Sequence, residues 1–184
     1  MADKQSITAE FVRKIIDYNP ENGSLMWKPR TPDMFKDGGH GREINCKGWN
    51  TRFANKQAGA KDPIEGYLII GIYGTLYRAH RIAWLYMTEE WPENDIDHKN
   101  LDRIDNTWSN LRQANDKFNN ANKSVTKNNK LGVKGVNYRR GKYEARIRVD
   151  GRLIILGYRN TKEEAAELYA EAAIMHFGEF ARVS

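Results

Sequence analysis

Hydrophobic positions in the first sixty residues predict a helix, a short strand and a long surface segment. Apolar residues recur at helical spacing after Thr8, whose hydroxyl can cap the helix, and Tyr18 ends this run. The dipeptide Asn22-Gly23 is typical of a turn, and the alternation from Leu25 to Lys28 then predicts a short strand. Residues 29–60 are rich in glycine and lysine and weakly patterned. We expect them to form a surface excursion with short strands at best.

The next segment predicts a hairpin followed by a helix. Apolar residues from Gly66 to Tyr77 flank Gly74-Thr75, a pair that is typical of a tight turn. Residues 79–87 carry apolar side chains on more than one face, which indicates a mostly buried helix. Trp91-Pro92 should end this helix, because the residue before a proline disfavours the helical conformation.

A strand, a loop, a second strand and a short helix are predicted in the polar stretch that follows. Asn94 to His98 suit a strand, residues 99–109 a polar loop, and residues 111–114 a second strand. Residues 115–122 can form two helical turns, although their many asparagines favour helix poorly. Elements this short cannot make a core alone, so the upstream hairpin and helix should support them.

The C-terminal third predicts a small antiparallel sheet packed on one helix. The three strands are expected at residues 134–140, 142–149 and 152–158. Asp150-Gly151 is a strong hairpin signal between the last two. Thr161 begins a capping box, and the helix after it should run to about Phe177. The polar, basic residues before this unit form a natural boundary.

These patterns predict an α+β protein of two domains. We expect the first domain at residues 1–123, a basic linker at 124–131 and the second domain at 132–184.

Apolar and charged side chains alternate along the middle strand of the C-terminal unit. Every second residue from Tyr143 to Val149 is apolar and should face the helix. Arg146 and Arg148 then lie on the open face, with Arg139 of the first strand nearby. Such a face suits a DNA groove, because guanidinium groups bind guanine and phosphate. An ordinary solvated basic face is the alternative.

The charge of the chain favours a polyanionic partner. Its 184 residues include 30 lysines and arginines against 24 acidic residues, a formal charge of +6 and a pI near 9.3. The basic excess is concentrated after Lys123: from there to Arg159 only Glu144 and Asp150 are acidic. Double-stranded DNA is therefore the expected partner.

Cysteine content and hydropathy limit the setting. The single cysteine, Cys46, excludes an intrachain disulfide and a cysteine-rich structural zinc site. The chain has no long apolar run and no signal-peptide pattern. We expect a soluble cytoplasmic protein with no membrane partner, a monomer or a dimer.

Residues of the central stretch suit metal-assisted hydrolysis. The oxygens of Asp97 and Asn119 are ligands that Mg²⁺ or Mn²⁺ prefer, and no other cofactor is expected. His98, uncharged at neutral pH, could deprotonate a water molecule. Asp97 and His98 point to opposite faces unless their strand bends or ends there. The amide of Asn110 could tie down the loop and help to orient His98.

Other polar residues near this stretch have plainer readings. Asp97-His98 could also be a hydrogen-bonded surface pair. His80 could reach the site, but its apolar helix favours a structural histidine. Arg112, like Arg81, could touch phosphate or lie on a solvated face.

The same residues resemble the phage-type and homing HNH endonucleases, which carry a ββα-metal motif. The resemblance rests on Asp97-His98, on Asn110-Leu111-Arg112 and on Asn119, and it extends upstream to about residue 8. It implies that Asp97 and Asn119 bind one divalent ion, that His98 is the general base, and that Asn110 positions the loop.

The C-terminal unit resembles the plant Apetala/ethylene-response-factor DNA-binding domain over residues 132–181. The resemblance is carried by four short motifs: Gly132 to Val136, Gly141 to Ile147, Leu156 to Tyr158, and Thr161 to Ala166. It implies a sheet that enters the major groove, with Lys134, Arg139 and Arg148 at DNA-contacting positions. Arg146 stands where that family usually has Glu, so the plant target sequence should not be transferred.

Together these features favour a metal-dependent DNA endonuclease of the homing or phage type, targeted by its C-terminal domain. The alternative is a sequence-specific DNA-binding regulator whose nuclease domain is inactive. An RNA-binding protein is a third reading, which the lack of an aromatic stacking pair on the basic strand face disfavours.

Overall fold

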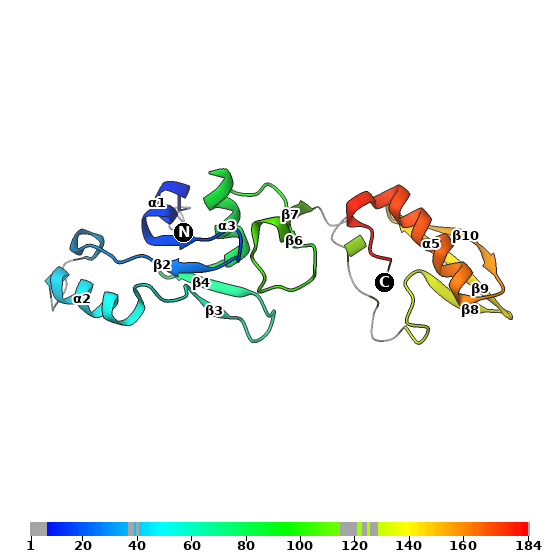
Figure 1. Ribbon diagram of the computed structural model, residues 1–184, viewed down its shortest axis with the longest axis horizontal. Helices are drawn as coiled ribbons and strands as arrows, with labels where there is room; N and C mark the ends of the chain where they lie inside the picture. The colour runs from blue at the N-terminus through cyan, green and yellow to red at the C-terminus, as the bar shows by residue number, and fades with distance from the viewer. Residues whose placement is uncertain are drawn as a thin grey trace. The chain divides into compact units, whose positions relative to one another are not determined.

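The computed structural model describes residues 7–36, 39, 41–114, 121–122, 125 and 129–183, which form a mixed α/β structure as expected. The chain divides into two compact units, Met1–Gln113 and Ala114–Ser184 (Figure 1). The predicted boundary at residue 123 lies inside the second of these units. The domain limits at 123 and 132 stay predictions. Of the helical turns predicted at 115–122, only Ala121 and Asn122 are described, and both are helical.

The first unit begins with a helix that is shorter than predicted. Helix α1 spans Ala9–Ile15, and the hydroxyl of Thr8 accepts from the Phe11 backbone N–H at 3.2 Å. Strand β1, Ile16–Tyr18, follows directly and pairs antiparallel with β2, Leu25–Trp27. The predicted helix to Tyr18 was wrong, because Ile16 and Tyr18 are buried on alternate positions of a strand.

A helix lies where no helix was expected. After the short 3₁₀ helix η1, Pro32–Met34, helix α2 spans Gly41–Phe53. Its only buried residue is Cys46, while Trp49 and Phe53 pack partly against the core. So few apolar positions leave no helical period to read, which explains why the sequence pattern failed here.

The hairpin and the helix after it form the middle of the first unit. Strands β3, β4 and β5 make an antiparallel sheet in that order, and α3 packs against β4 and β5. Their bounds are Ala60–Lys61, Leu68–Ile72, Thr75–Arg78 and, for α3, Ala79–Thr88. The hairpin turns at Tyr73-Gly74, one residue before the predicted pair, because Ile72 pairs with Thr75. Both turn residues have positive φ, 48° and 79°.

The candidate site rests on this core. Strands β6, Asp95–His98, and β7, Leu111–Ala114, pair in a two-stranded sheet, and η2, Trp108–Asn110, leads into β7. Ile96 and Leu111 belong to the same buried cluster as residues of α1, β4 and α3. The hairpin and helix therefore support the two strands, as expected.

The second unit is a three-stranded sheet with one helix. Strands β8, β9 and β10 pair antiparallel in the order β10-β9-β8, with a register shift between Ile155 and Gly157. The bounds are Val136–Arg139, Lys142–Val149 and Arg152–Arg159, with α5 at Lys162–Phe177 and η3 at Gly178–Phe180. Ala145 and Ile147 of β9 are buried in clusters with residues of α5. Thr161 forms the expected capping box. Within the described residues, no helix is long and apolar enough to cross a membrane.

The turn between β1 and β2 suggests a stability test. A β-carbon at Gly23 would lie 2.5 Å from the backbone nitrogen of Thr107, and Gly23 has φ +72°. Gly23→Ala should therefore lower the free energy of unfolding by about 2–4 kcal/mol, about 1 from the positive φ and about 1–3 from the clash. Gly74→Ala is the control, because φ is +79° there but nothing lies within 4 Å. Thermal denaturation showing equal losses for both variants would contradict the tight contact.

Candidate active site

A loop closed by side-chain amides joins β6 to β7. The Asn110 Oδ1 accepts from the backbone N–H of Asn100 at 3.0 Å, and its Nδ2 donates to Asn100 Oδ1 at 3.0 Å and to the Asp105 carbonyl at 2.8 Å. The Asn100 Nδ2 donates to Asp105 Oδ2 at 2.6 Å. Asn110 is buried, so these bonds are shielded from water and hold both ends of the loop together.

The β1–β2 turn holds the same loop from the other side. The hydroxyl of Tyr18 donates to the carbonyl of Asn106 at 2.7 Å, and the Trp108 backbone N–H donates to the carbonyl of Pro20 at 2.9 Å. Gly23 packs directly against Asn106 and Thr107. Burial raises the pKa of Tyr18 to about 12, so its hydroxyl stays protonated and keeps donating.

His98 is buried among two rings and an amide. Its ring centroid lies 5.0 Å from that of His80, at 88°, and 6.0 Å from that of Tyr67. Its Nε2 lies 3.4 Å from Asn106 Oδ1. The Nδ2 of Asn106 donates to the Ile104 carbonyl at 3.1 Å, which fixes the amide with its oxygen toward His98. Because that oxygen can only accept, this contact favours the tautomer with the proton on Nε2 and the lone pair on Nδ1.

Both histidines are held in the neutral form. Burial lowers the pKa of His98, although the Asn106 contact and the nearby carboxylates, Asp97 foremost, oppose the shift. Burial, together with the charges of His98, Arg78 and Arg81, lowers the pKa of His80 to about 3. His80 was expected either to reach the site or to be a structural histidine. The structure places it beside His98, with its own Nδ1 buried and without a hydrogen-bond partner.

Asp97 is bound by an arginine from the neighbouring strand. Its Oδ2 accepts from Arg112 Nε at 3.1 Å and from Nη2 at 3.0 Å, and the two side chains are only 12% and 9% exposed. The reading of Arg112 as part of a solvated face was therefore wrong, while its contact with phosphate stays a prediction. Burial along β6 alternates, with Ile96 and His98 buried and Asp97 half-buried. Asp97 is thus not a surface partner of His98.

The predicted metal site is described only in part, because Asn119 lies outside the described residues. Within the described ranges, no group of three or more His, Cys, Asp or Glu side chains could hold a metal ion. Mg²⁺, however, needs only one or two carboxylates and completes its shell with water and phosphate oxygens. The largely buried carboxylate of Asp97 fits that limited donor set.

Comparison with known proteins identifies the region that contains these residues. Residues 77–121 match the family model described as HNH endonuclease. This segment is similar to an HNH endonuclease domain. It is also 36% identical over 104 residues to an uncharacterized HNH endonuclease of Acanthamoeba polyphaga mimivirus, covering 55% of this chain and 54% of that protein. The chain thus spans about half the length of this relative. No solved structure matches the present chain.

The match to the HNH endonuclease family covers α3, β6, the loop and β7, but not the β1–β2 turn that holds the loop. Sequence reasoning named His98, Asp97 and Asn110 but missed Asn106. Nothing local marks Asn106 as the partner of His98, because its position depends on the contact with Tyr18. The turn signal at Asn22-Gly23, within the upstream stretch that the resemblance covers, was the available signal.

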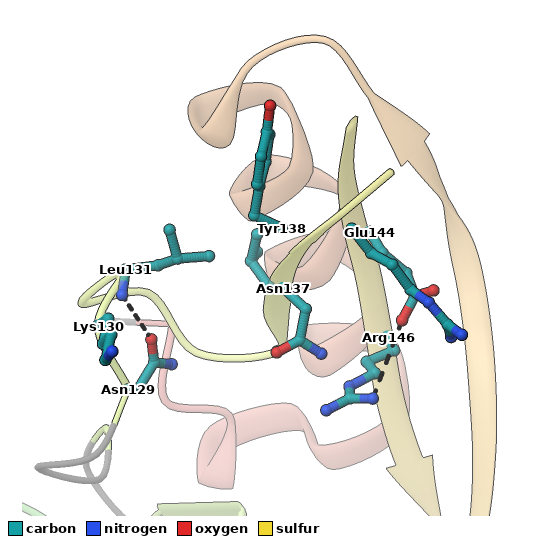
Figure 2. Close-up of a pocket in the computed structure, with 10 residues that line it drawn as sticks. Asn129, Lys130, Leu131, Asn137, Tyr138, Glu144 and Arg146 are labelled. Carbon is teal, nitrogen blue, oxygen red and sulfur yellow. Dashed lines mark hydrogen bonds and ion pairs between the residues drawn. The ribbon is translucent and has the colours of Figure 1, made fainter. Parts of the chain in front are cut away.

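Outside the HNH endonuclease match, the arginines predicted to bind DNA differ in their surroundings. The Arg146 Nη1 lies 3.9 Å from Glu144 Oε1, and its Nε and Nη2 lie 2.6 Å from the Asn137 amide oxygen, oriented toward the guanidinium. These residues line a groove of about 840 Å³ beside β8 and β9 (Figure 2). Arg139 and Arg148 are exposed.

Lys134 stands apart from these arginines. It is partly buried, and its ammonium group donates to the Ala121 carbonyl. Burial lowers its pKa to about 8. The ammonium group thus already binds a carbonyl of the second unit. The DNA contact of Lys134 stays a prediction.

The Asp97–Arg112 pair yields a test of the site's internal support. Arg112→Met should lower the free energy of unfolding by about 3 kcal/mol, because it removes the guanidinium from a largely buried carboxylate. Arg78→Met is the matched control, since its pair with Glu65 is 42% and 49% exposed and should be worth at most about 1 kcal/mol. Urea denaturation measures both. Equal small losses would show that Asp97 does not depend on Arg112.

Proposed function

We propose that this protein is a metal-dependent endonuclease that hydrolyses phosphodiester bonds of double-stranded DNA. The observation that carries the proposal is His98: it lies within the HNH match and is buried, with its Nε2 facing the amide oxygen of Asn106. An imidazole held this way has a lone pair at Nδ1 and needs no prior deprotonation to act as a base.

Each residue of the site has one task in this proposal. His98 Nδ1 takes the proton of the water that attacks the phosphorus, while Asn106 keeps the ring in the correct tautomer. Asp97 and Asn119 would hold one Mg²⁺ or Mn²⁺. When bound, such an ion supplies positive charge that stabilises the leaving 3′-oxygen and the pentavalent phosphate. Asn110 keeps the loop closed, so that Asn106 remains in place.

The second unit would deliver this site to DNA. Arg146 and Arg148 belong to β9, and Arg139 belongs to the adjacent β8. In the register of the sheet, Arg146 pairs with Ile155 and Arg148 with Leu153, and both of these apolar residues are exposed. A mixed arginine and apolar sheet face suits a DNA groove, because guanidinium groups bind phosphates and guanine while apolar groups contact thymine methyls. Tethering the two units would raise the local concentration of scissile phosphate. A homing or phage-type role fits the viral relative.

The first prediction concerns the general base. With Mg²⁺ or Mn²⁺, the wild-type protein should nick or cut duplex DNA, and His98→Ala should reduce the cleavage rate by at least about 10²-fold without weakening DNA binding. Gel analysis of plasmid nicking measures cleavage, and fluorescence anisotropy in chelator measures binding.

His176→Ala provides the control for this experiment, because that histidine lies in α5 of the second unit and should leave the rate unchanged. Unchanged cleavage by His98→Ala would remove His98 from the role of base. Binding without any cleavage by the wild type would instead favour a DNA-binding regulator.

The second prediction concerns the arginine face. Replacing Arg146 and Arg148 with Ala should weaken duplex binding and reduce the slope of log K against log salt by about 0.9 for each phosphate that is no longer neutralised. Arg152→Ala is the control: it pairs with Val149, so it lies on the helix-side face of the sheet. If Arg146→Ala and Arg148→Ala keep the wild-type salt slope, as the Arg152→Ala control should, the open face does not bind DNA.

A further inference from the structure

An aromatic pocket lies in the first unit, at the end formed by β2, α2 and the β4–β5 hairpin. Its volume is about 620 Å³, and its walls are Trp27, Arg30, Trp49, Phe53, Tyr73 and Leu76. Tyr73 and Leu76 are 63% and 69% exposed, so they form an open apolar rim. None of these residues belongs to the candidate active site or to the sheet of the second unit.

The cation in this pocket is Arg30, whose backbone and guanidinium group are both held by residues of α2. The side chain of Asn50 in α2 accepts from the Arg30 backbone N–H at 2.8 Å and donates to the Arg30 carbonyl at 2.8 Å. The guanidinium carbon lies 3.9 Å from the centroid of the Trp49 ring and 5.4 Å from that of Trp27. Stacking on indole therefore fixes the plane of the group.

The same guanidinium has unused hydrogen-bonding capacity. Arg30 Nε is buried without a hydrogen-bond partner, and among the described residues no carboxylate forms an ion pair with Arg30. Burial of this group lowers the pKa of Arg30. A half-buried cation with an unsatisfied donor is costly to maintain unless a ligand offers an acceptor.

The surroundings indicate the charge of that ligand. Residues 28–61, which include Arg30 and α2, hold eight lysines and arginines against three acidic residues. Residues 1–27 and 62–113 together hold eight basic and thirteen acidic residues. The basic excess of the first unit is therefore confined to the segment that builds the pocket. An anionic polymer is attracted to this end and not to the rest of the unit.

We propose that this pocket, the Arg30 pocket, binds one unpaired nucleobase of DNA. A nucleobase has a π-face that stacks on aromatic rings or on a guanidinium plane, and carbonyl oxygens that accept from arginine. Its phosphates lie within reach of the basic segment around the pocket. This inference rests on the proposed function, because it takes DNA as the substrate. It adds a base-binding contact on the nuclease unit itself.

The experiment compares DNA with and without bases. Fluorescence anisotropy in chelator measures binding of the full chain to a mixed-sequence single-stranded oligonucleotide and to an abasic oligonucleotide of equal length and charge. Arg30→Lys keeps the charge but loses the planar group, and Tyr73→Ala removes the exposed rim ring, whose contact in the fold is a stack on Phe11. Both should weaken binding to the base-containing strand about tenfold and leave the abasic strand within twofold.

Lys47→Gln in α2 is the control for charge, and it should weaken binding to the base-containing and the abasic strand equally. Equal binding by wild type and both pocket variants, or equal losses on the two strands, would overturn the base pocket. If duplex cleavage by the wild type persists in that case, the proposed function stands without it. A wild-type protein that neither binds nor cuts any DNA would overturn both.

Discussion

The contact between the β1–β2 turn and Asn106 is the constraint on which the candidate site depends. Tyr18 and Pro20 bind the loop backbone on both sides of Thr107, and Gly23 leaves no room for a side chain there. With its backbone held there, the amide of Asn106 donates to the Ile104 carbonyl and turns its oxygen toward His98, which favours one tautomer of that ring. A tyrosine 88 positions upstream of Asn106 thus helps to determine which nitrogen is basic.

Local sequence patterns predicted much of the fold. The cap at Thr8, the capping box at Thr161 and the alternation along β9 each act within a few residues, so they can be read directly from the sequence. Helix α2 could not be read, because it has few apolar residues and is also held by the hydrogen bonds of Asn50 and the aromatic contacts of Arg30. The hairpin turn was misplaced by one residue, because Tyr73 adopts a positive φ that glycine usually takes.

The candidate site was predictable in identity but not in its pairing. Its motif residues stand at fixed spacing, so His98 and Asn110 could be named from the sequence. The partner of Asp97 could not, because Arg112 reaches it across paired strands from fifteen residues away. A guanidinium on Asp97 also means that any metal ion shares this carboxylate with a second cation. Charge balance around Asp97 therefore links the stability of the fold to the chemistry of the site.

The tautomer of His98 tests this arrangement most directly. A long-range ¹H–¹⁵N correlation spectrum of protein labelled at its histidine ring nitrogens, recorded at neutral pH, reports which nitrogen carries the proton. The His98→Ala spectrum assigns the signals. We expect a neutral ring with the proton on Nε2 and an unprotonated Nδ1. A ring protonated on Nδ1, or on both nitrogens, would contradict the role of Asn106 and of His98 as a ready base.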